Sequence, residues 1–320
     1  MLKMEIGGQE IHGIVFVQNP KSSKAELVEE TIEKIKANYP KLEHKKVITS
    51  LDPNETVEEI EKTTECDDLV CVAGGEGTVN LAAKAYMTRF LSDQIIPHFI
   101  LPGGSKNDLA SSIYSNDVLK NPIRTILTST VTPIYLIEFS LVTGEGVVEH
   151  DYAVSYGGFG GTAEVSSLVN LRRSGLISGQ MRKYQSGKFV LEAFNTFHGL
   201  ATTQQFSLID HNDRDQPKNL SELSFINGSR MAGGVISTPV EVNDTQSVKI
   251  EQSSRLKLFL KLADLAIMVP RKDIVQEIDE DFTLTTQAKF HIDAEPRLIV
   301  PETRVKVSRS SRPFYVLSNL

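Results

Sequence analysis

The chain has 320 residues, a formal net charge of −7 at pH 7 and a pI of about 5.6. This length predicts about two domains, each large enough for a core of its own. The acidic balance argues against a general nucleic-acid binder, because such proteins usually carry a basic face. Seven scattered histidines show no metal-ligand spacing.

The chain shows no targeting or membrane-spanning pattern. Residues 1–13 lack the basic start and apolar core of a signal peptide. No apolar run reaches the roughly 18–20 residues that span a bilayer, and the nearest, residues 256–270, is broken by Lys257, Lys261 and Asp264. We therefore expect a cytoplasmic protein that contacts a membrane only peripherally.

The first elements alternate between strand and helix. Residues 14–17 form a continuous apolar run, which predicts a strand buried on both faces of a parallel sheet. A loop follows, and Ser23 and Glu26 then form a capping-box pattern for a helix. The expected apolar stripe of this helix is Leu27, Ile32 and Ile35.

The pattern repeats over the next 30 residues. Residues 47–49 predict a second strand, and Asn54 is the expected cap of a helix that carries Val57 and Ile60. The apolar run 69–73 then predicts a third strand, which feeds the glycine-rich turn Gly74–Thr78. A helix follows this turn, because the apolar residues Val79, Ala83, Tyr86 and Phe90 recur at helical spacing.

A strand, a glycine loop and a helix in succession are typical of phosphate binding. Glycines let the backbone approach an anion closely, and a helix N-terminus presents unpaired N–H groups. A second apolar run, residues 99–101, leads into the glycine-containing loop 102–108 and a short helical pattern. Alternating strands and helices predict a doubly wound parallel sheet, which binds ligands beyond the carboxyl ends of its strands. The two loops are therefore predicted to form the walls of a nucleotide site.

The alternation of strands and helices ends at about residue 130. Residues 134–142 and 147–156 predict strands joined by a hairpin at 143–146. Residues 168–197 look mostly helical, and short strands and turns dominate from Gln205 onward. The basic residues 172, 173, 182, 183 and 188 could meet anionic headgroups or form a solvated face, and the apolar helix face at 189–197 could be core or line an acyl-chain pocket.

The segment Gly158–Ala163 fits the dinucleotide fingerprint G-x-G-x-x-A. It does not begin a recognisable βαβ unit, and no acidic residue stands at the end of a following strand about 20 residues on. The sequence therefore disfavours an NAD site at this position.

Taken in order, these motifs resemble the diacylglycerol kinase catalytic-domain superfamily, which includes bacterial soluble lipid kinases and sphingosine kinases. The resemblance rests on Asn19–Ser23, Thr49, Gly74–Thr78, Pro102–Asp108, Gly158–Gly160 with Ala163, Phe225–Gly228 with Gly233, Gly234 and Pro239, and His291–Pro296.

The resemblance implies an α/β protein of two domains. A doubly wound ATP-binding domain would comprise residues 1–130, with residues 304–320 returning to pack on it. A β-rich, sandwich-like lipid-substrate domain would comprise residues 131–303, with the active site in the cleft between the two. The implied activity is transfer of the ATP γ-phosphate to a lipid hydroxyl, most simply that of diacylglycerol, with Mg²⁺.

The resemblance also assigns site residues. Glu76 would hold Mg²⁺, and Asp244 is the remaining candidate for a structural metal site. Asp293 or Glu295 would act as the base, and in a strand both side chains would face the same way. The alternative for this pair is an exposed edge-strand pair. The expected nucleotide-binding residues are Asn19, Pro20, Lys21, Ser22, Ser23, Thr49, Gly74, Gly75, Gly77, Thr78, Gly103, Gly104, Ser105, Asn107 and Asp108.

The chain departs from the family pattern at four positions. Glu76 replaces Asp, Ser105 replaces Thr, and Thr245 and Ala294 stand where the family usually has Gly. These changes keep open a catalytically weak nucleotide or lipid sensor, and a kinase of NAD is the nearest enzyme rival. The sequence names neither the acceptor lipid nor the oligomeric state, for which a homodimer is the commonest arrangement.

Overall fold

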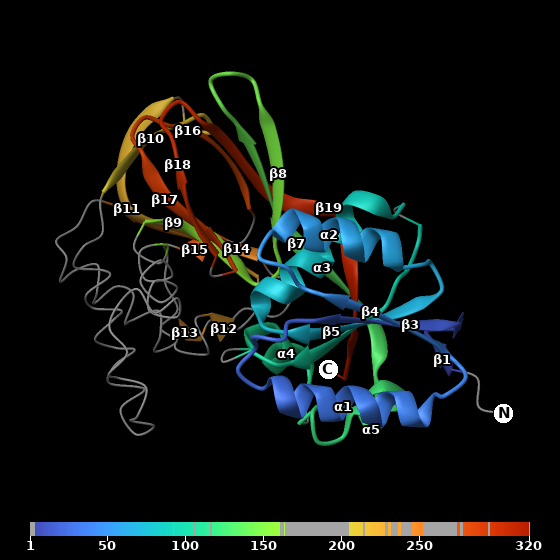
Figure 1. The fold of residues 1–320 in the computed structure, drawn as a ribbon. Helices are drawn as coiled ribbons and strands as arrows, with labels where there is room; N and C mark the ends of the chain where they lie inside the picture. The colour runs from blue at the N-terminus through green and yellow to red at the C-terminus, as the bar shows by residue number, and fades with distance from the viewer. Residues whose placement is uncertain are drawn as a thin grey trace. The chain divides into compact units, whose positions relative to one another are not determined.

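The computed structural model describes residues 4–160, 205–227, 245–251 and 278–319, except 92, 105–106, 116, 214 and 294, together with Ala163 and the short strands 230–231, 236–237 and 274–275. The chain divides into two compact units (Figure 1). Unit 1 comprises residues 1–136, 228–235 and 310–320, and unit 2 comprises residues 137–227 and 236–309. The division falls within two strands, β7 (Thr130–Val142) and β19 (Arg304–Ser318).

Unit 1 is built on a parallel sheet in the order β19-β6-β5-β3-β4. Its strands besides β19 are β3 (Gly13–Gln18), β4 (Glu43–Ile48), β5 (Asp68–Gly74) and β6 (His98–Pro102). Its helices are α1 (Ala25–Asn38), α2 (Pro53–Thr63), α3 (Glu76–Arg89), α4 (Asp108–Ile113) and α5 (Pro122–Thr128). Figure 1 shows α1 and α5 on one face of this sheet and α2 and α3 on the other, so the predicted doubly wound architecture is confirmed.

Two predicted helix caps are wrong. Helix α1 follows Lys24 and has no side-chain cap, because the hydroxyl of Ser23 donates to the carbonyl oxygen of Gly103 instead of the helix. Its buried stripe is Val28, Thr31, Ile32 and Ile35, whereas Leu27 is 40% exposed. Helix α2 is capped by Asp52, whose side chain accepts from the backbone N–H of Asn54 at 2.8 Å. Asn54 therefore lies inside the helix, because Pro53 is its first residue.

An N-terminal hairpin precedes the sheet. Strands β1 (Met4–Ile6) and β2 (Gln9–Ile11) pair in antiparallel register around Gly7 and Gly8. Both glycines have positive φ, +60° and +82°, which a two-residue type I′ turn requires. Gly-Gly between two short apolar-ended segments is a hairpin signal that our sequence analysis missed.

The end of the chain returns to unit 1. Val316 of β19 pairs in parallel with His98 of β6, and the Arg312 guanidinium donates to the carbonyl oxygens of Tyr86 and Phe90 at the end of α3. His98 is fully enclosed, and burial lowers its pKa to about 4. Its neutral ring contacts the carbonyl oxygens of Ile96 and Tyr315 at 2.9 and 3.0 Å. Partly buried hydrogen bonds thus hold this segment on the sheet and on helix α3.

Unit 2 is an antiparallel β structure. Its strands follow the order β18-β17-β9-β11-β10-β16, with β14 beside β11 and the β7–β8 hairpin joined through β7 to β19. The bounds are β8 (Val148–Ala153), β9 (Tyr156–Gly160), β10 (Phe206–Asp210), β11 (Gln216–Asn227), β14 (Thr245–Glu251), β15 (Ile274–Val275), β16 (Asp279–Leu284), β17 (Ala288–Ile292) and β18 (Glu295–Ile299), with β13 (Ile236–Ser237) in unit 2 and β12 (Arg230–Met231) in unit 1. Its core contains the buried rings of Phe139, Phe159, Phe206, Phe225, Phe282 and Phe290.

Two sequence-based expectations for unit 2 are confirmed. The β7–β8 hairpin forms in antiparallel register, with Gly146 at φ +79° in its turn. The glycines of the dinucleotide-like motif do not form a phosphate loop, because they lie in β9 between β11 and β17. A Cβ on Gly158 would stand 2.5 Å from the carbonyl oxygen of Leu223, so glycine is required there for strand packing.

The predicted helical region 168–197, with its basic and apolar residues, lies outside the described residues, as do Gly233, Gly234 and Pro239. Among the helices that the structure describes, none combines the length and the apolar character needed to cross a membrane.

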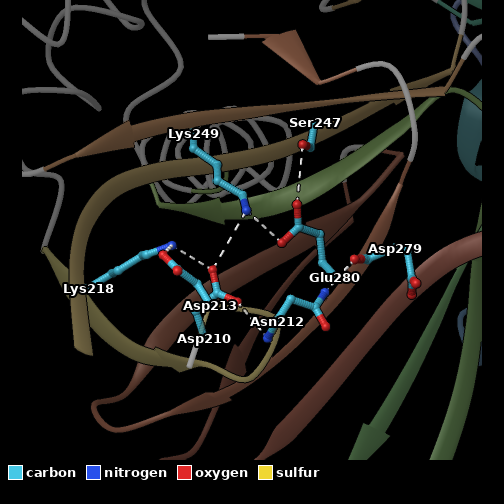
Figure 2. Close-up of polar contacts among 8 residues, drawn as sticks. All are labelled: Asp210, Asn212, Asp213, Lys218, Ser247, Lys249, Asp279 and Glu280. Carbon is cyan, nitrogen blue, oxygen red and sulfur yellow. Dashed lines mark hydrogen bonds and ion pairs between the residues drawn. The ribbon is translucent and has the colours of Figure 1, made fainter. Parts of the chain in front are cut away.

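A network of charged side chains joins strands β10, β11, β14 and β16 (Figure 2). The carboxylate of Asp210 accepts from Lys218 Nζ at 2.7 Å and lies 3.9 Å from Lys249 Nζ, which also contacts Glu280 at 2.7 Å. Burial alone would raise the pKa of Asp210, but the two ammonium groups outweigh it and hold this pKa below its ordinary value. The network therefore favours the ionised carboxylate in the folded state.

We predict that Lys218→Met lowers the free energy of unfolding by about 1 kcal/mol near neutral pH, because it leaves Asp210 without its nearest cation. A carboxylate with a depressed folded-state pKa contributes stability above its unfolded pKa of about 3.9 and loses it as the pH falls further. The difference between variant and wild type should therefore shrink below about pH 4 in denaturant titrations. Lys62→Met, which removes the exposed partner of Glu58, is the control, and an equal effect of both variants would contradict the account.

Candidate functional site

Four loops of unit 1 lie at one edge of its sheet. Strands β3, β4, β5 and β6 run parallel, so the segments that follow them leave at their common carboxyl ends. Asn19 N donates to the carbonyl oxygen of Ala73, and Thr49 N donates to that of Gln18, each at 3.0 Å. The structure thus brings the predicted nucleotide-binding loops of unit 1 to the same edge.

The glycine loops after β5 and β6 touch through their backbones. The N–H groups of Gly103 and Gly104 both donate to the carbonyl oxygen of Gly74, at 2.9 and 3.1 Å. A Cβ on Gly103 would lie 3.3 Å from the Cα of Gly74, and a Cβ on Gly74 would lie 2.2 Å from Thr78 Oγ1. A side chain at Gly74 would therefore collide with the first turn of α3, and one at Gly103 would crowd the Gly74 backbone.

The loop after β3 is fastened to the same place. Lys24 N and the Ser23 hydroxyl both donate to the carbonyl oxygen of Gly103, at 3.1 and 3.3 Å. The side chain of Asn19 accepts from Lys21 N at 2.9 Å and so closes its own turn. Pro20 and Lys21 are exposed, and Ser22 lies against Gly103. The side chain of Asn19 therefore stabilises the loop after β3, and that of Ser23 links this loop to the loop after β6.

Helix α3 begins directly at this contact. Gly75 is its N-cap and supplies no side chain, and its carbonyl oxygen accepts from the N–H groups of Thr78 and Val79. The N–H groups of the first residues of a helix have no acceptor within the helix and lie at the positive end of its dipole. Gly75, Glu76 and Gly77 thus present donors and positive potential, which suit a phosphate.

Glu76 links the starts of two helices. Its Oε1 accepts from the backbone N–H of Leu109, in the first turn of α4, at 3.4 Å. Asn107 exchanges two hydrogen bonds with the backbone of Gly104, at 3.1 and 3.0 Å, so its amide closes the second glycine loop. Asp108 is buried as the first residue of α4. Ser105 lies outside the described residues.

The predicted arrangement of Asp293 and Glu295 is wrong. Asp293 is not in a strand; it lies in the turn between β17 and β18, with φ +43°, and Ile292 pairs with Glu295 across that turn. The alternation of a strand therefore does not apply to the two carboxylates. The turn follows the preference of Asp for positive φ, and only the backbone of Glu295 is described.

The carboxylate of Asp293 is buried and holds the segment Val154–Tyr156. Its Oδ2 accepts from Val154 N at 2.8 Å, and its Oδ1 accepts from Ser155 N and Tyr156 N at 3.0 Å each. Asn227 holds the same segment, since its amide donates to the carbonyl oxygen of Val154 and its N–H to that of Ser155. Asp293 and Asn227, from two motifs far apart in the sequence, thus both bind the segment 154–156.

Asn227 and this segment were not among the predicted site residues. Asn227 stands in the Asn-Gly motif, which could have pointed to it, whereas Ser155 and Tyr156 carry no local signal. Asp244 lies outside the described residues. The described part of the chain holds no group of three or more His, Cys, Asp or Glu side chains placed to bind a metal ion.

Comparison with known proteins supports this organisation. Residues 13–139 match the model of the diacylglycerol kinase catalytic domain. The match covers β3 to β6, α1 to α5 and the glycine loops of unit 1 and ends within β7. No curated protein matches the chain.

Solved structures share the fold of this chain. A diacylglycerol kinase from Bacillus anthracis str. Sterne is similar with a TM-score of 0.63 and 15% identity, over 96% of this chain and 97% of that one. A yeast NADH kinase complexed with NADH is similar with a TM-score of 0.55 and 11% identity, over 98% of this chain and 85% of that one. At these identities the likeness concerns the fold alone.

We predict that Asp293→Asn lowers the free energy of unfolding by about 1–3 kcal/mol, because an amide group would face an N–H donor and leave it buried without an acceptor. Thermal melts of the purified variant measure the loss. Asp93→Asn, in an exposed turn, is the control and should change the stability by less than about 0.5 kcal/mol. An unaltered melting temperature for Asp293→Asn would show that these hydrogen bonds do not support the fold.

Proposed function

We propose that the chain is an ATP-dependent lipid kinase that transfers the γ-phosphate of ATP to a lipid hydroxyl, with diacylglycerol as its acceptor. The observation that carries this proposal is the backbone contact between Gly74 and Gly103 at the start of α3. This contact fixes the start of α3, whose N–H donors and positive end are suited to bind a phosphate chain. The match of residues 13–139 to the diacylglycerol kinase catalytic domain supports transfer to a lipid.

Phosphoryl transfer depends mainly on positioning and on neutralising the charge of the phosphates. In this proposal the N–H groups of Gly75 to Gly77 donate to phosphate oxygens. The hydrogen bonds between the loops after β3, β5 and β6 limit the movement of these loops. Bound Mg²⁺ would neutralise charge on the transferring phosphate. A single carboxylate beside the phosphates suits this ion, which is usually held by one or two carboxylates and the substrate phosphates. Glu76 has the chemistry and the place for that role.

Of the two candidate bases, Asp293 and Glu295, we propose Glu295. The carboxylate oxygens of Asp293 already accept three backbone N–H groups. A general base needs a lone pair directed at the proton that it removes. In our proposal Asp293 therefore positions the segment 154–156, and Glu295, two residues further on, accepts the proton of the lipid hydroxyl.

The test follows label from γ-labelled ATP into micelles that contain diacylglycerol, monoacylglycerol, ceramide or sphingosine, with NAD as an additional acceptor. We expect label in diacylglycerol, and we expect Glu295→Gln to lower kcat by about 100-fold or more while the KM for ATP and the melting temperature stay unchanged. Glu145→Gln, in the exposed turn of the β7–β8 hairpin, is the matched control.

Other outcomes of the same assay would contradict the proposal. Label in NAD alone would identify the nucleotide kinase whose fold the chain shares. ATP binding without label in any acceptor would favour a nucleotide or lipid sensor and would withdraw the role of Glu295.

A further inference from the structure

The proposed base stands at the start of a strand with few neighbours. Glu295 is the first residue of β18, which ends its row of strands and, among the strands that the structure describes, pairs with β17 alone. Only two residues of the chain separate Glu295 from β17, and the first of them is Asp293, with φ +43°. Segments with few contacts open most readily. The place of Glu295 therefore depends on what holds Asp293.

Asp293 is held by the segment Val154–Tyr156, which leads into β9. Its carboxylate accepts from all three N–H groups of this segment, and its own N–H donates to the carbonyl oxygen of Tyr156 at 2.9 Å. Asp293 is only 2% exposed, so water competes little for these bonds. Four hydrogen bonds thus join the turn before β18 to one short segment.

Asn227 holds the other side of the same segment. It is the last residue of β11 and is buried. Its side-chain amide donates to the carbonyl oxygen of Val154 at 3.0 Å, and its backbone N–H donates to that of Ser155 at 2.7 Å. An alanine variant keeps the backbone bond and loses the bond to Val154. The contribution of the side chain can therefore be measured by itself.

We propose that Asn227 is a positioning residue for the base, an inference that rests on the proposed function. Its amide fixes the carbonyl oxygen of Val154, and the N–H groups of Val154–Tyr156 fix the carboxylate of Asp293. Asp293 in turn fixes the start of β18, where Glu295 lies. A catalytic group must be held within about 0.5 Å of its productive position, and a misplacement of about 1 Å can cost about 100-fold in rate. Loss of one bond in this series should therefore slow phosphoryl transfer.

The test is a double-mutant cycle that measures kcat with dioctanoylglycerol and γ-labelled ATP. We expect Asn227→Ala to lower kcat about 10-fold and to leave the KM for ATP unchanged, because the nucleotide loops belong to unit 1. In the Glu295→Gln background the base is already absent, so the same substitution should lower kcat by less than about 2-fold. A merely structural role would lower kcat by the same factor in both backgrounds.

Amide hydrogen exchange measures the link to the turn without any activity. The N–H of Asp293, which donates to Tyr156, should exchange faster in Asn227→Ala than in wild type, because the segment that accepts it is held less firmly. Unchanged exchange at Asp293 would show that Asn227 does not act on this turn.

Asn212→Ala is the matched control. The side-chain amide of Asn212 also donates to a backbone carbonyl oxygen, that of Asp279, at 2.6 Å. It lies in the turn before β11, however, at the opposite end of that strand from Asn227. This variant should leave kcat, the KM for ATP and the exchange of Asp293 unchanged.

Three kinetic outcomes would overturn the inference, and they are distinguishable. An unchanged kcat in Asn227→Ala, with an active wild type, would show that Asn227 does not position the base. Equal losses of kcat in the two backgrounds would assign Asn227 a structural role. A wild type that labels no lipid would overturn the proposed function itself, and this inference with it.

Discussion

The contact between Gly74 and Gly103 is the constraint on which the phosphate-binding edge of unit 1 depends. The carbonyl oxygen of Gly74 accepts two N–H groups from the loop after β6, and the carbonyl oxygen of Gly103 accepts two groups from the loop after β3. Three loops are thereby joined with hardly any side chain between them. A Cβ on Gly74 would collide with Thr78, and a Cβ on Gly103 would lie 3.3 Å from the Gly74 Cα, so a side chain at either position would strain this arrangement.

In unit 2, polar side chains, and not contacts between glycine backbones, hold a segment of the candidate site in place. The segment 154–156 is held by two polar side chains, Asp293 and Asn227, which reach it from the ends of neighbouring strands. A buried carboxylate is tolerated there because three N–H donors replace its water. A residue in a motif that resembles a catalytic signature can therefore serve as a support for the backbone, with the chemistry carried by its neighbours.

Much of unit 1 could be predicted because its signals are local. Continuous apolar runs gave the buried strands, and helical spacing from Val79 to Phe90 gave α3. The local signals failed where two neighbours competed for one role. Asp52 caps α2 in place of Asn54, because Pro53 is the first residue of the helix. Ser23 does not cap α1, because its hydroxyl donates to the carbonyl oxygen of Gly103, which follows β6, two strands away from β3 in the sheet.

The candidate site in unit 2 was less accessible to sequence analysis for a physical reason. The partners of Asp293 lie 137 to 139 residues earlier in the chain, so no spacing rule relates them. The x-Asp-x-Glu pattern also looked like a strand, whereas the positive φ of Asp293 places it in a turn. In the same way, the glycines around Phe159 resembled a nucleotide fingerprint but serve the close packing of β9.

Amide hydrogen exchange with and without a non-hydrolysable Mg²⁺–ATP analogue tests the central claim of this account most directly. If the start of α3 holds the phosphates, the amides of Gly75, Glu76 and Gly77 will exchange more slowly when the analogue is bound, because phosphate oxygens then accept from them. Saturating binding that leaves these three amides unchanged and protects another segment would contradict the account and move the nucleotide site elsewhere.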